Sequence, residues 1–349
     1  MAKVINFKKR SPVNVMTNPP IDEQNFTTSI EEFAENAFAE VMELAIKGDP
    51  ESQNNIGECY EYGFGIDEDT SEAFKWYQKS ATQSYAPALA NLGECYEYGI
   101  GTRKNMFRAF DCYNKAAIKG ISDAQYNVGF CYQYGEGTKK NLTKAVEWYT
   151  KAAKQGNLPA MNDLAKCYKL GSGVDKDLAI ALNYFRQAAN HGNPDAQLNL
   201  AICYYEGSGV ARSLHKSVEY CTMAAEQNNA DAQLMMGMFY SMGEGVTENL
   251  FTATLWFRAA ADHNQPDATF QLANCYQYGL GVEQDSRKAA EYFERAANLN
   301  HPEAQYIIGQ YYEYGISVDK SIFIATCWYK KAAAQGIRDA VDALRHLEK

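Results

Sequence analysis

The stretch APALANLGECYEYGIGTRKNMFRAFDCYNKAAIKG, residues 86–120, contains the pattern of two α-helices. A glycine stands at its centre, and glycine readily takes the left-handed conformation in which helices end. We therefore expect a first helix, helix A, from about residue 86 to Gly99. Small or apolar residues recur before that glycine at spacings of four, seven and eight, as one face of a helix requires: Ala88, Leu92, Gly93, Cys95 and Tyr96.

The second half of the stretch predicts a second helix, helix B. Asn105 belongs to the residue types whose side chains accept hydrogen bonds from the free N–H groups of a first helical turn. Beyond it, one helical face carries apolar residues up to the next glycine, Gly120. These residues are Ala109, Tyr113, Ala116 and Ala117.

The same pattern recurs eight times with a period of 36 residues. Eight units without insertion occupy about residues 50–336, which predicts an all-α solenoid of stacked helix pairs. A tetrapeptide similar to Gly/Ala-x-Cys-Tyr marks each unit and begins at Gly57, Gly93, Gly129, Ala165, Ala201, Gly237, Ala273 and Gly309.

The expected helix boundaries recur with this period. Glycine ends helix A at Gly63, Gly99, Gly135, Gly171, Gly207, Gly243, Gly279 and Gly315. Capping residue types begin helix B at Asp69, Asn105, Asn141, Asp177, Ser213, Asn249, Asp285 and Ser321,. Glycine or asparagine, with one serine, ends helix B at Gly48, Ser84, Gly120, Gly156, Gly192, Asn228, Asn264, Asn300 and Gly336,.

Small residues predict where the helices cross closely. The position of Gly93 holds only glycine or alanine in all eight units, so a larger side chain there would force two helices apart. A second position holds alanine from the second unit onward: Ala88, Ala124, Ala160, Ala196, Ala232, Ala268, Ala304 and Ala340.

The consensus A-x-x-x-L-G-x-C-Y-x-x-G-x-G, followed by K-A-x-x-[YW]-x-x-K-A-A-x-x-G, strongly resembles the Sel1-like repeat family, which is related to the tetratricopeptide repeats. The resemblance covers about four-fifths of the chain; Ser217 in place of alanine and Ser317 in place of glycine depart from it. It implies a right-handed α/α superhelix that acts as an adaptor in signalling, protein quality control or host–microbe contact. It implies no shared catalytic centre.

The sequence outside the repeats predicts caps and a tail. Residues 1–25 contain prolines and no periodicity, so we expect a disordered segment. Thr28 and Ser29 each precede a glutamate by three residues, a capping-box pattern that predicts a capping helix within residues 26–49. Residues 337–349 resemble a shortened helix A, with Arg345 where glycine or alanine would admit another repeat, and we expect a C-terminal capping helix there.

Charge and hydropathy exclude several classes of function. The formal net charge is −10 and the pI is about 5.1, which argues against a nucleic-acid partner,. No stretch approaches the roughly 20 apolar residues that span a bilayer, so we expect no membrane insertion. The N-terminus lacks the apolar core of a secretory signal, and we expect a cytoplasmic protein. Secretion as an effector without such a signal stays open.

No residue pattern indicates catalysis, a metal or a cofactor. The Gly-x-Gly sequences follow helices, whereas nucleotide-binding loops follow strands. Six of the nine cysteines share one repeat position, where equivalent residues lie roughly 8–10 Å or more apart, too far for disulfides,. We therefore expect free thiols. The five histidines have no spacing suited to a metal site or to a catalytic base.

The resemblance to tetratricopeptide repeats also implies which part of helix A faces the concave groove. In the first two units this face is acidic and aromatic, whereas lysines break the pattern in the fourth unit. The candidate partner-binding residues are Glu58, Glu61, Tyr62, Glu94, Glu97, Tyr98, Tyr126, Phe130, Gln133, Tyr134, Lys166, Lys169 and Tyr205. Packing of these aromatic residues against the next unit is the alternative interpretation.

The sequence thus favours a non-enzymatic scaffold or adaptor that binds a protein or peptide segment in its concave groove. A regulatory subunit or a secreted bacterial effector that acts through protein binding is an alternative. A hydrolase or small-molecule binder is a weaker one, because no nucleophile, base and orienting group recur together.

Overall fold

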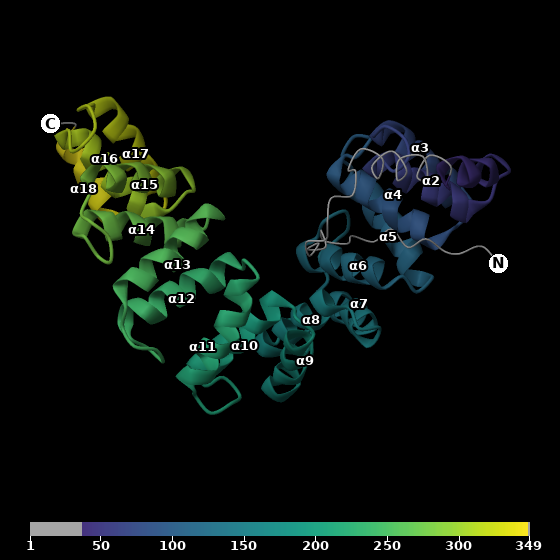
Figure 1. Cartoon of the computed structure of the whole chain (residues 1–349), viewed down its shortest axis with the longest axis horizontal. Helices are drawn as coiled ribbons and strands as arrows, with labels where there is room; N and C mark the ends of the chain where they lie inside the picture. Colours follow the sequence, from purple (N-terminus) through teal and green to yellow (C-terminus); the bar gives the residue numbers. More distant parts are fainter. Residues whose placement is uncertain (1–36, 348–349) are drawn as a thin grey trace, which may run out of the picture. The chain divides into compact units, whose positions relative to one another are not determined.

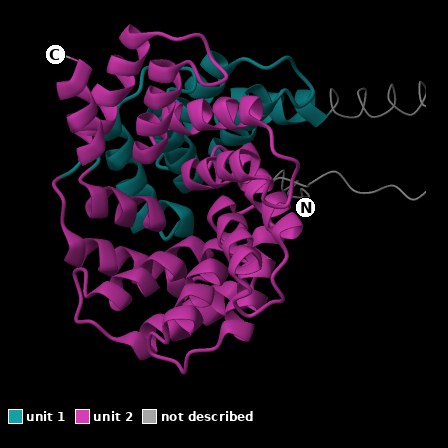
Figure 2. Cartoon of the chain, turned by 90° about the vertical axis from the view of Figure 1, so that its left-hand side faces the viewer, with its two compact units in different colours: residues 1–124, 136–138 teal, residues 125–135, 139–349 magenta. Residues whose placement is uncertain are grey.

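The computed structural model describes residues 37–347, and this part of the chain consists of helices and turns without a strand (Figure 1). It divides into two compact units (Figure 2). Unit 1 extends to Ala124 and includes residues 136–138, and unit 2 contains residues 125–135 and 139 onward. No sequence pattern indicated this division, which falls inside a repeat. The predicted tail at residues 1–25 lies outside the described residues.

Eight pairs of 13-residue helices follow a helix at residues 37–46. The A helices are α2 (Pro50–Tyr62), α4 (Ala86–Tyr98), α6 (Ser122–Tyr134), α8 (Leu158–Leu170), α10 (Pro194–Glu206), α12 (Ala230–Met242), α14 (Pro266–Tyr278) and α16 (Pro302–Tyr314). The B helices are α3 (Thr70–Thr82), α5 (Met106–Ile118), α7 (Leu142–Lys154), α9 (Leu178–Asn190), α11 (Leu214–Glu226), α13 (Leu250–Asp262), α15 (Ser286–Asn298) and α17 (Ile322–Ala334). The last helix is α18 (Arg338–Leu347). The predicted all-α repeat fold is confirmed.

The predicted helix boundaries are also correct. Each of the eight expected residues caps a helix B, as Asn105 does by accepting a hydrogen bond from the Arg108 N–H at 3.1 Å. Helix A ends at a left-handed glycine: Gly99 has φ 80° and donates its N–H to the Cys95 carbonyl at 2.9 Å. Every predicted end of helix B likewise has positive φ, including Ser84 at 61°.

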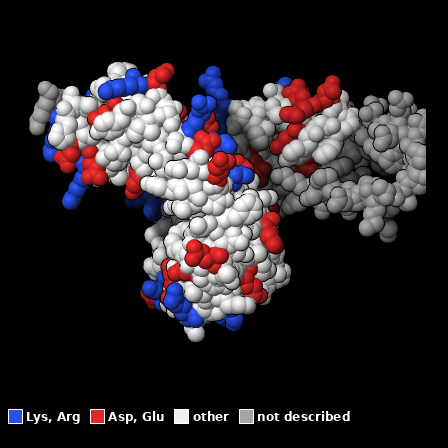
Figure 3. Space-filling model, turned by 60° about the vertical axis from the view of Figure 1, so that its left-hand side comes forward, with Lys and Arg blue, Asp and Glu red and all other residues white. Residues whose placement is uncertain are grey.

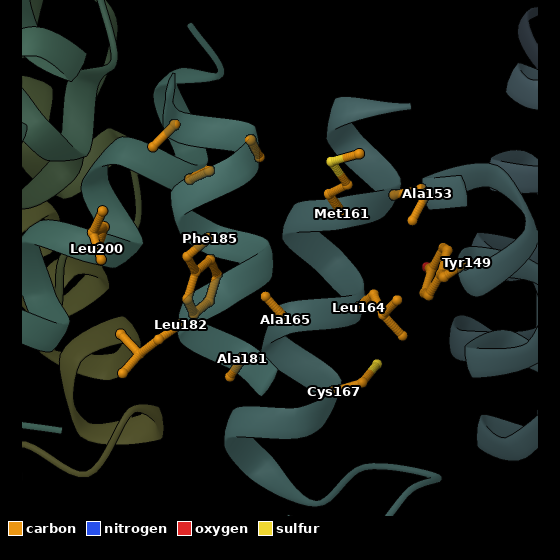
Figure 4. Packing of buried hydrophobic residues seen from close by; sticks show 14 of the residues in the cluster. Tyr149, Ala153, Met161, Leu164, Ala165, Cys167, Ala181, Leu182, Phe185 and Leu200 are labelled. Atoms are coloured by element: carbon orange, nitrogen blue, oxygen red, sulfur yellow. The ribbon is translucent and has the colours of Figure 1, made fainter. Parts of the chain in front are cut away.

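The glycine of helix A lies directly beneath an aromatic ring of helix B. A Cβ atom on Gly93 would come within 2.5 Å of Tyr113 Cε1, and Tyr113 is fully buried. Where alanine replaces this glycine, the facing residue is phenylalanine or cysteine, as Figure 4 shows for Ala165 and Phe185. The predicted close crossing is therefore between the two helices of one repeat.

The recurring cysteines fill small gaps in this core, as predicted. None of the nine cysteines, all of which lie within the described residues, forms a disulfide, and eight of them are buried; the exception is Cys327. Burial raises the pKa of Cys221 to about 12, so this thiol stays protonated at neutral pH.

Pairs of glutamines connect the two helices of four repeats. The fourth residue of helix A and the residue after helix B form these pairs: Gln83 donates to Gln53 at 2.9 Å, Gln155 to Gln125 at 2.8 Å, Gln227 to Gln197 at 2.7 Å and Gln335 to Gln305 at 2.8 Å. The sixth repeat breaks the rule. There His263 stands after helix B in place of the second glutamine, and the buried Gln233 Oε1 atom has no hydrogen-bond partner.

A second set of bonds connects successive A helices in unit 2. The side chain of the residue that caps helix A accepts a hydrogen bond from the backbone N–H group three residues later. The same side chain donates a hydrogen bond to an acidic residue of the preceding helix A. Asn229 donates to Asp195 at 2.9 Å, and Gln265 donates to Asp231 at 3.3 Å. His301 does both with its two ring nitrogens: Nδ1 accepts the Ala304 N–H at 3.2 Å, and Nε2 lies 3.3 Å from Asp267 Oδ1.

Replacing Gly93 with leucine should lower the free energy of unfolding by about 1–3 kcal/mol or more, because the new side chain would overlap the Tyr113 ring,. Thermal unfolding followed by circular dichroism measures the loss. Ala90→Leu is the matched control, because the same position of helix A holds Leu198 and Leu234 in other repeats. A Gly93→Leu protein that melts like the wild type would contradict the close contact.

Replacing His263 with glutamine should raise the free energy of unfolding by about 1 kcal/mol, because the new amide can donate to the unpaired Gln233 oxygen,. Urea unfolding measures the gain. His191→Gln is the control, since Met161 occupies the position of Gln233 in that repeat and offers no acceptor. Equal gains in both variants would show that the Gln233 oxygen is not the cause.

The His301 cap should make stability depend on pH. Burial lowers the pKa of His301 below its usual 6.5, against the opposing effects of Glu303 and Asp267. Below pH 6.5 the unfolded chain therefore binds more protons than the folded protein. As the pH falls through this range, the free energy of unfolding should decrease by up to about 1.4 kcal/mol per pH unit. Above pH 6.5, His301 makes no contribution to the slope. Urea unfolding between pH 5 and 8 tests this. His301→Asn, which introduces the same cap as Asn229, should remove this contribution, and an unchanged slope would refute the assignment.

Candidate functional site

We call the side of each helix A that carries its second, fifth, sixth, ninth, twelfth and thirteenth residues the helix-A face. The thirteenth residue is exposed in all eight repeats. Tyr62, Tyr98 and Tyr134 are 56%, 60% and 56% exposed, and the same position in other repeats exposes Leu170, Met242, Tyr278 and Tyr314. Large apolar side chains that are this exposed are candidates for contact with a partner.

Three of the five predicted residues at the twelfth position accept hydrogen bonds from buried tyrosines. Glu61 accepts a hydrogen bond from the buried Tyr77 hydroxyl at 2.6 Å, and Glu97 accepts one from Tyr113 at 2.5 Å. Gln133 accepts one from Tyr149 at 2.8 Å. Each side chain thereby satisfies a phenol that would otherwise be unpaired inside the protein. The sequence contained a signal for this role, because donor and acceptor are always 16 residues apart.

The predicted Glu58, at the ninth position, takes part in bonds across repeats. Asn54 donates to Glu58 at 3.0 Å, and Asn91 reaches both residues, donating to the Asn54 oxygen at 3.0 Å and to Glu58 at 3.3 Å. These bonds connect α2 to α4. Glu94 is half-buried beside them and contributes to the electrostatic environment of Tyr62.

Three predicted aromatic residues form a ladder on α6. The ring centroids of Tyr126 and Phe130 are 6.5 Å apart, and those of Phe130 and Tyr134 are 4.5 Å apart. Tyr126 also packs on Tyr149, and its hydroxyl donates to Asp163 at 3.2 Å. Only Tyr134 is largely exposed, and the ring contacts of Tyr126 and Phe130 lie within the third repeat.

The predicted lysines do not produce a basic surface. Lys166 pairs with Asp163 at 3.1 Å, and Lys169 pairs with Glu206 at 3.3 Å. Tyr205 is likewise engaged within the protein, because its hydroxyl donates to Glu244 at 2.9 Å. The reversal of charge expected in the fourth repeat is therefore neutralised by neighbouring carboxylates.

A depression of about 390 Å³ lies on the helix-A face of unit 2. Three successive A helices, α8, α10 and α12, contribute to it. Its apolar residues are Leu198, Ile202 and Met235, and its polar residues are Lys166, Asp195, Asn199 and Asp231. Of these seven residues only Lys166 was predicted. Leu198 and Ile202 are at the fifth and ninth helix positions, which were expected to face the groove but were not among the candidates, whereas the second and sixth positions were not expected to face it.

The polar rim of this depression is held in place by the bonds between repeats. Asp195 accepts from Asn229, and Asp231 accepts from Gln265. Asn199 donates to Asn162 at 2.9 Å. The recurring aspartate at the second position of helix A could have revealed these rim residues in the sequence. Such a site can hold an apolar side chain and bond the flanking polar groups.

A second depression of about 430 Å³ is formed by α15 and the residue that follows it, where Glu291, Glu294 and Arg295 line it. A single helix offers no opposing wall, so this depression is poorly suited to hold a segment. On the face of the molecule in Figure 3, acidic and basic side chains lie interspersed between uncharged areas.

The described residues offer no grouping of histidine, cysteine, aspartate or glutamate suited to a metal ion. Over residues 37–347, no helix has the length and apolar character needed to cross a bilayer.

The comparisons with known proteins agree with this architecture. A crystal structure of a Sel1 repeat protein from Oxalobacter formigenes is 29% identical, with a TM-score of 0.65 over 88% of this chain and 89% of that one. The protective antigen c5321 of uropathogenic Escherichia coli is 26% identical, with a TM-score of 0.56 over 93% of this chain and 80% of that one. No curated protein matches the sequence.

Proteins built from Sel1 repeats are generally scaffolds for protein interactions. The Sel1 repeat profile matches eight consecutive segments: 50–85, 86–121, 122–157, 158–193, 194–229, 230–265, 266–301 and 302–337. Their boundaries coincide with the helix pairs described above, and the chain belongs to the Sel1 repeat family.

Proposed function

We propose that this protein is a non-enzymatic scaffold that holds a segment of a partner protein on its helix-A face. The depression across α8, α10 and α12 is the observation that carries the proposal. Three successive repeats contribute to it, so a segment that crosses it would contact several helices at once. Its apolar floor and bonded polar rim match the central anchor and polar surround of protein interfaces.

The chemistry of the depression defines the segment that fits. One aliphatic or aromatic side chain would bury itself between Leu198, Ile202 and Met235. Donor groups of the segment, including backbone N–H groups, would bond Asp195 and Asp231, whose positions are fixed by Asn229 and Gln265. Since these side chains are already ordered, binding would cost little additional conformational entropy.

The proposal predicts that Ile202→Glu weakens binding of the partner by about 2–4 kcal/mol, because a charge would enter the apolar floor. A photo-crosslinking amino acid at Met235 first identifies the partner in cells, and isothermal titration calorimetry then compares the purified proteins.

Leu255→Glu is the matched control for this experiment. Leu255 is a 45% exposed leucine on the helix-B α13 in the same unit, outside the depression. It receives the same charge, and this variant should bind normally. Normal binding by Ile202→Glu, with its helical content intact, would exclude the depression as the contact.

A further inference from the structure

The helix-A face of unit 1 differs in charge from the depression in unit 2. Helices α2 and α4 read PESQNNIGECYEY and APALANLGECYEY, and neither contains lysine or arginine. Five glutamates lie on their helix-A faces, and four of them, at the ninth and twelfth positions, accompany two exposed tyrosines. We call this surface the acidic face: Glu58, Glu61, Tyr62, Glu94, Glu97 and Tyr98.

The acidic face is continuous across two repeats. Asn91 of α4 donates to Asn54 and Glu58 of α2, so the two helices are connected at this surface. Partial burial, and then the carboxylates of Glu61, Glu94 and Glu58, raise the pKa of Tyr62 to about 12. Carboxylates from both helices therefore act on the same tyrosine.

Two of these carboxylates are fixed in position. The buried hydroxyls of Tyr77 and Tyr113 donate to Glu61 and Glu97, and a phenol is a neutral donor, so it leaves the negative charge in place. The neighbouring Tyr62 and Tyr98 rings are more than half exposed. The surface thus combines held negative charge with aromatic rings, and both attract cations.

We propose that the acidic face binds an extended segment of a partner protein that carries lysine or arginine at about every third residue. In the extended polyproline II conformation, side chains three residues apart lie on the same side of the segment and about 9 Å apart, which is close to the spacing of roughly 8–10 Å between packed helices. A basic side chain could then meet the carboxylates of each repeat in turn. The residues between them would pack on Tyr62 and Tyr98, where a cation can also lie over the ring.

This inference extends the proposed function to a second surface and does not depend on the depression in unit 2. A fluorescently labelled peptide, KSLKSLKSLKSL, serves as the probe for binding to the full-length protein, and ESLESLESLESL is its acidic counterpart. The basic peptide should bind, more weakly as the salt concentration rises, and the acidic one should not.

The double variant Glu61→Gln with Glu97→Gln should reduce affinity for the basic peptide at least tenfold, because two charges disappear from the contact. The fold should survive, since Gln133 accepts the Tyr149 hydroxyl at the same position of the third repeat. Tyr62→Ala with Tyr98→Ala should produce a similar loss, roughly tenfold or more.

A matched control removes two charges elsewhere. Glu313 of α16 accepts the Tyr329 hydroxyl at 2.6 Å, as Glu61 accepts that of Tyr77, and Glu283 is exposed in the same unit. Glu283→Gln with Glu313→Gln should leave the affinity for the basic peptide unchanged. Ile202→Glu should also leave it unchanged, which separates failure of this inference from failure of the proposed function.

The chain itself carries Lys8, Lys9 and Arg10, which could compete for the acidic face. Tighter peptide binding after replacement of all three by serine would support the assignment and identify that competitor. Equal losses in the Glu61–Glu97 and Glu283–Glu313 variants would overturn the proposal, as would equal binding of the two peptides or no binding of the basic one.

Discussion

The rest of the fold depends on a close contact between the two helices of a repeat. A glycine or alanine of helix A lies against an aromatic ring of helix B, as Gly93 lies against Tyr113. Because the Tyr113 ring occupies the space of a Gly93 side chain, the two helices of a repeat can approach closely. The ring's hydroxyl then needs an acceptor inside the protein, and Glu97 supplies it. A packing requirement in the core therefore places a carboxylate on the surface.

Much of the fold could be predicted because its signals are local and repeated. A glycine at positive φ and a side-chain cap such as Asn105 are determined by residues a few positions away in the chain. Because each pattern occurs in eight repeats, it can be distinguished from a chance occurrence. The glutamine pairs and the bonds between A helices were not predicted. Both join residues 30 or more positions apart, so the pairing of donor and acceptor can be recognised only once the fold brings them together.

The candidate site was less predictable than the fold, for two physical reasons. A glutamate that accepts a hydrogen bond from a buried hydroxyl cannot be told from a solvent-exposed one by its residue type, so the role of Glu61 could be read only from the recurring 16-residue spacing to a tyrosine. The depression is lined by side chains of different sizes from three repeats, among them Ile202 and Met235. Repeat position alone does not encode that shape.

Several side-chain hydrogen bonds also bear on how a repeat can be duplicated as a whole segment. Glu61 with Tyr77, Gln197 with Gln227 and Asp231 with Gln265 each close inside one 36-residue segment. Across segment boundaries, Gln197 and Gln233 instead donate to the backbone carbonyls of Ala189 and Ala225, which any residue provides. A duplicated or transplanted segment thus carries these partners with it, whereas bonds such as those from Asn91 to Asn54 and Glu58 require a matching neighbour. Arrays of such segments can lengthen by gene duplication while each copy keeps its own core, leaving the exposed end of helix A free to diverge.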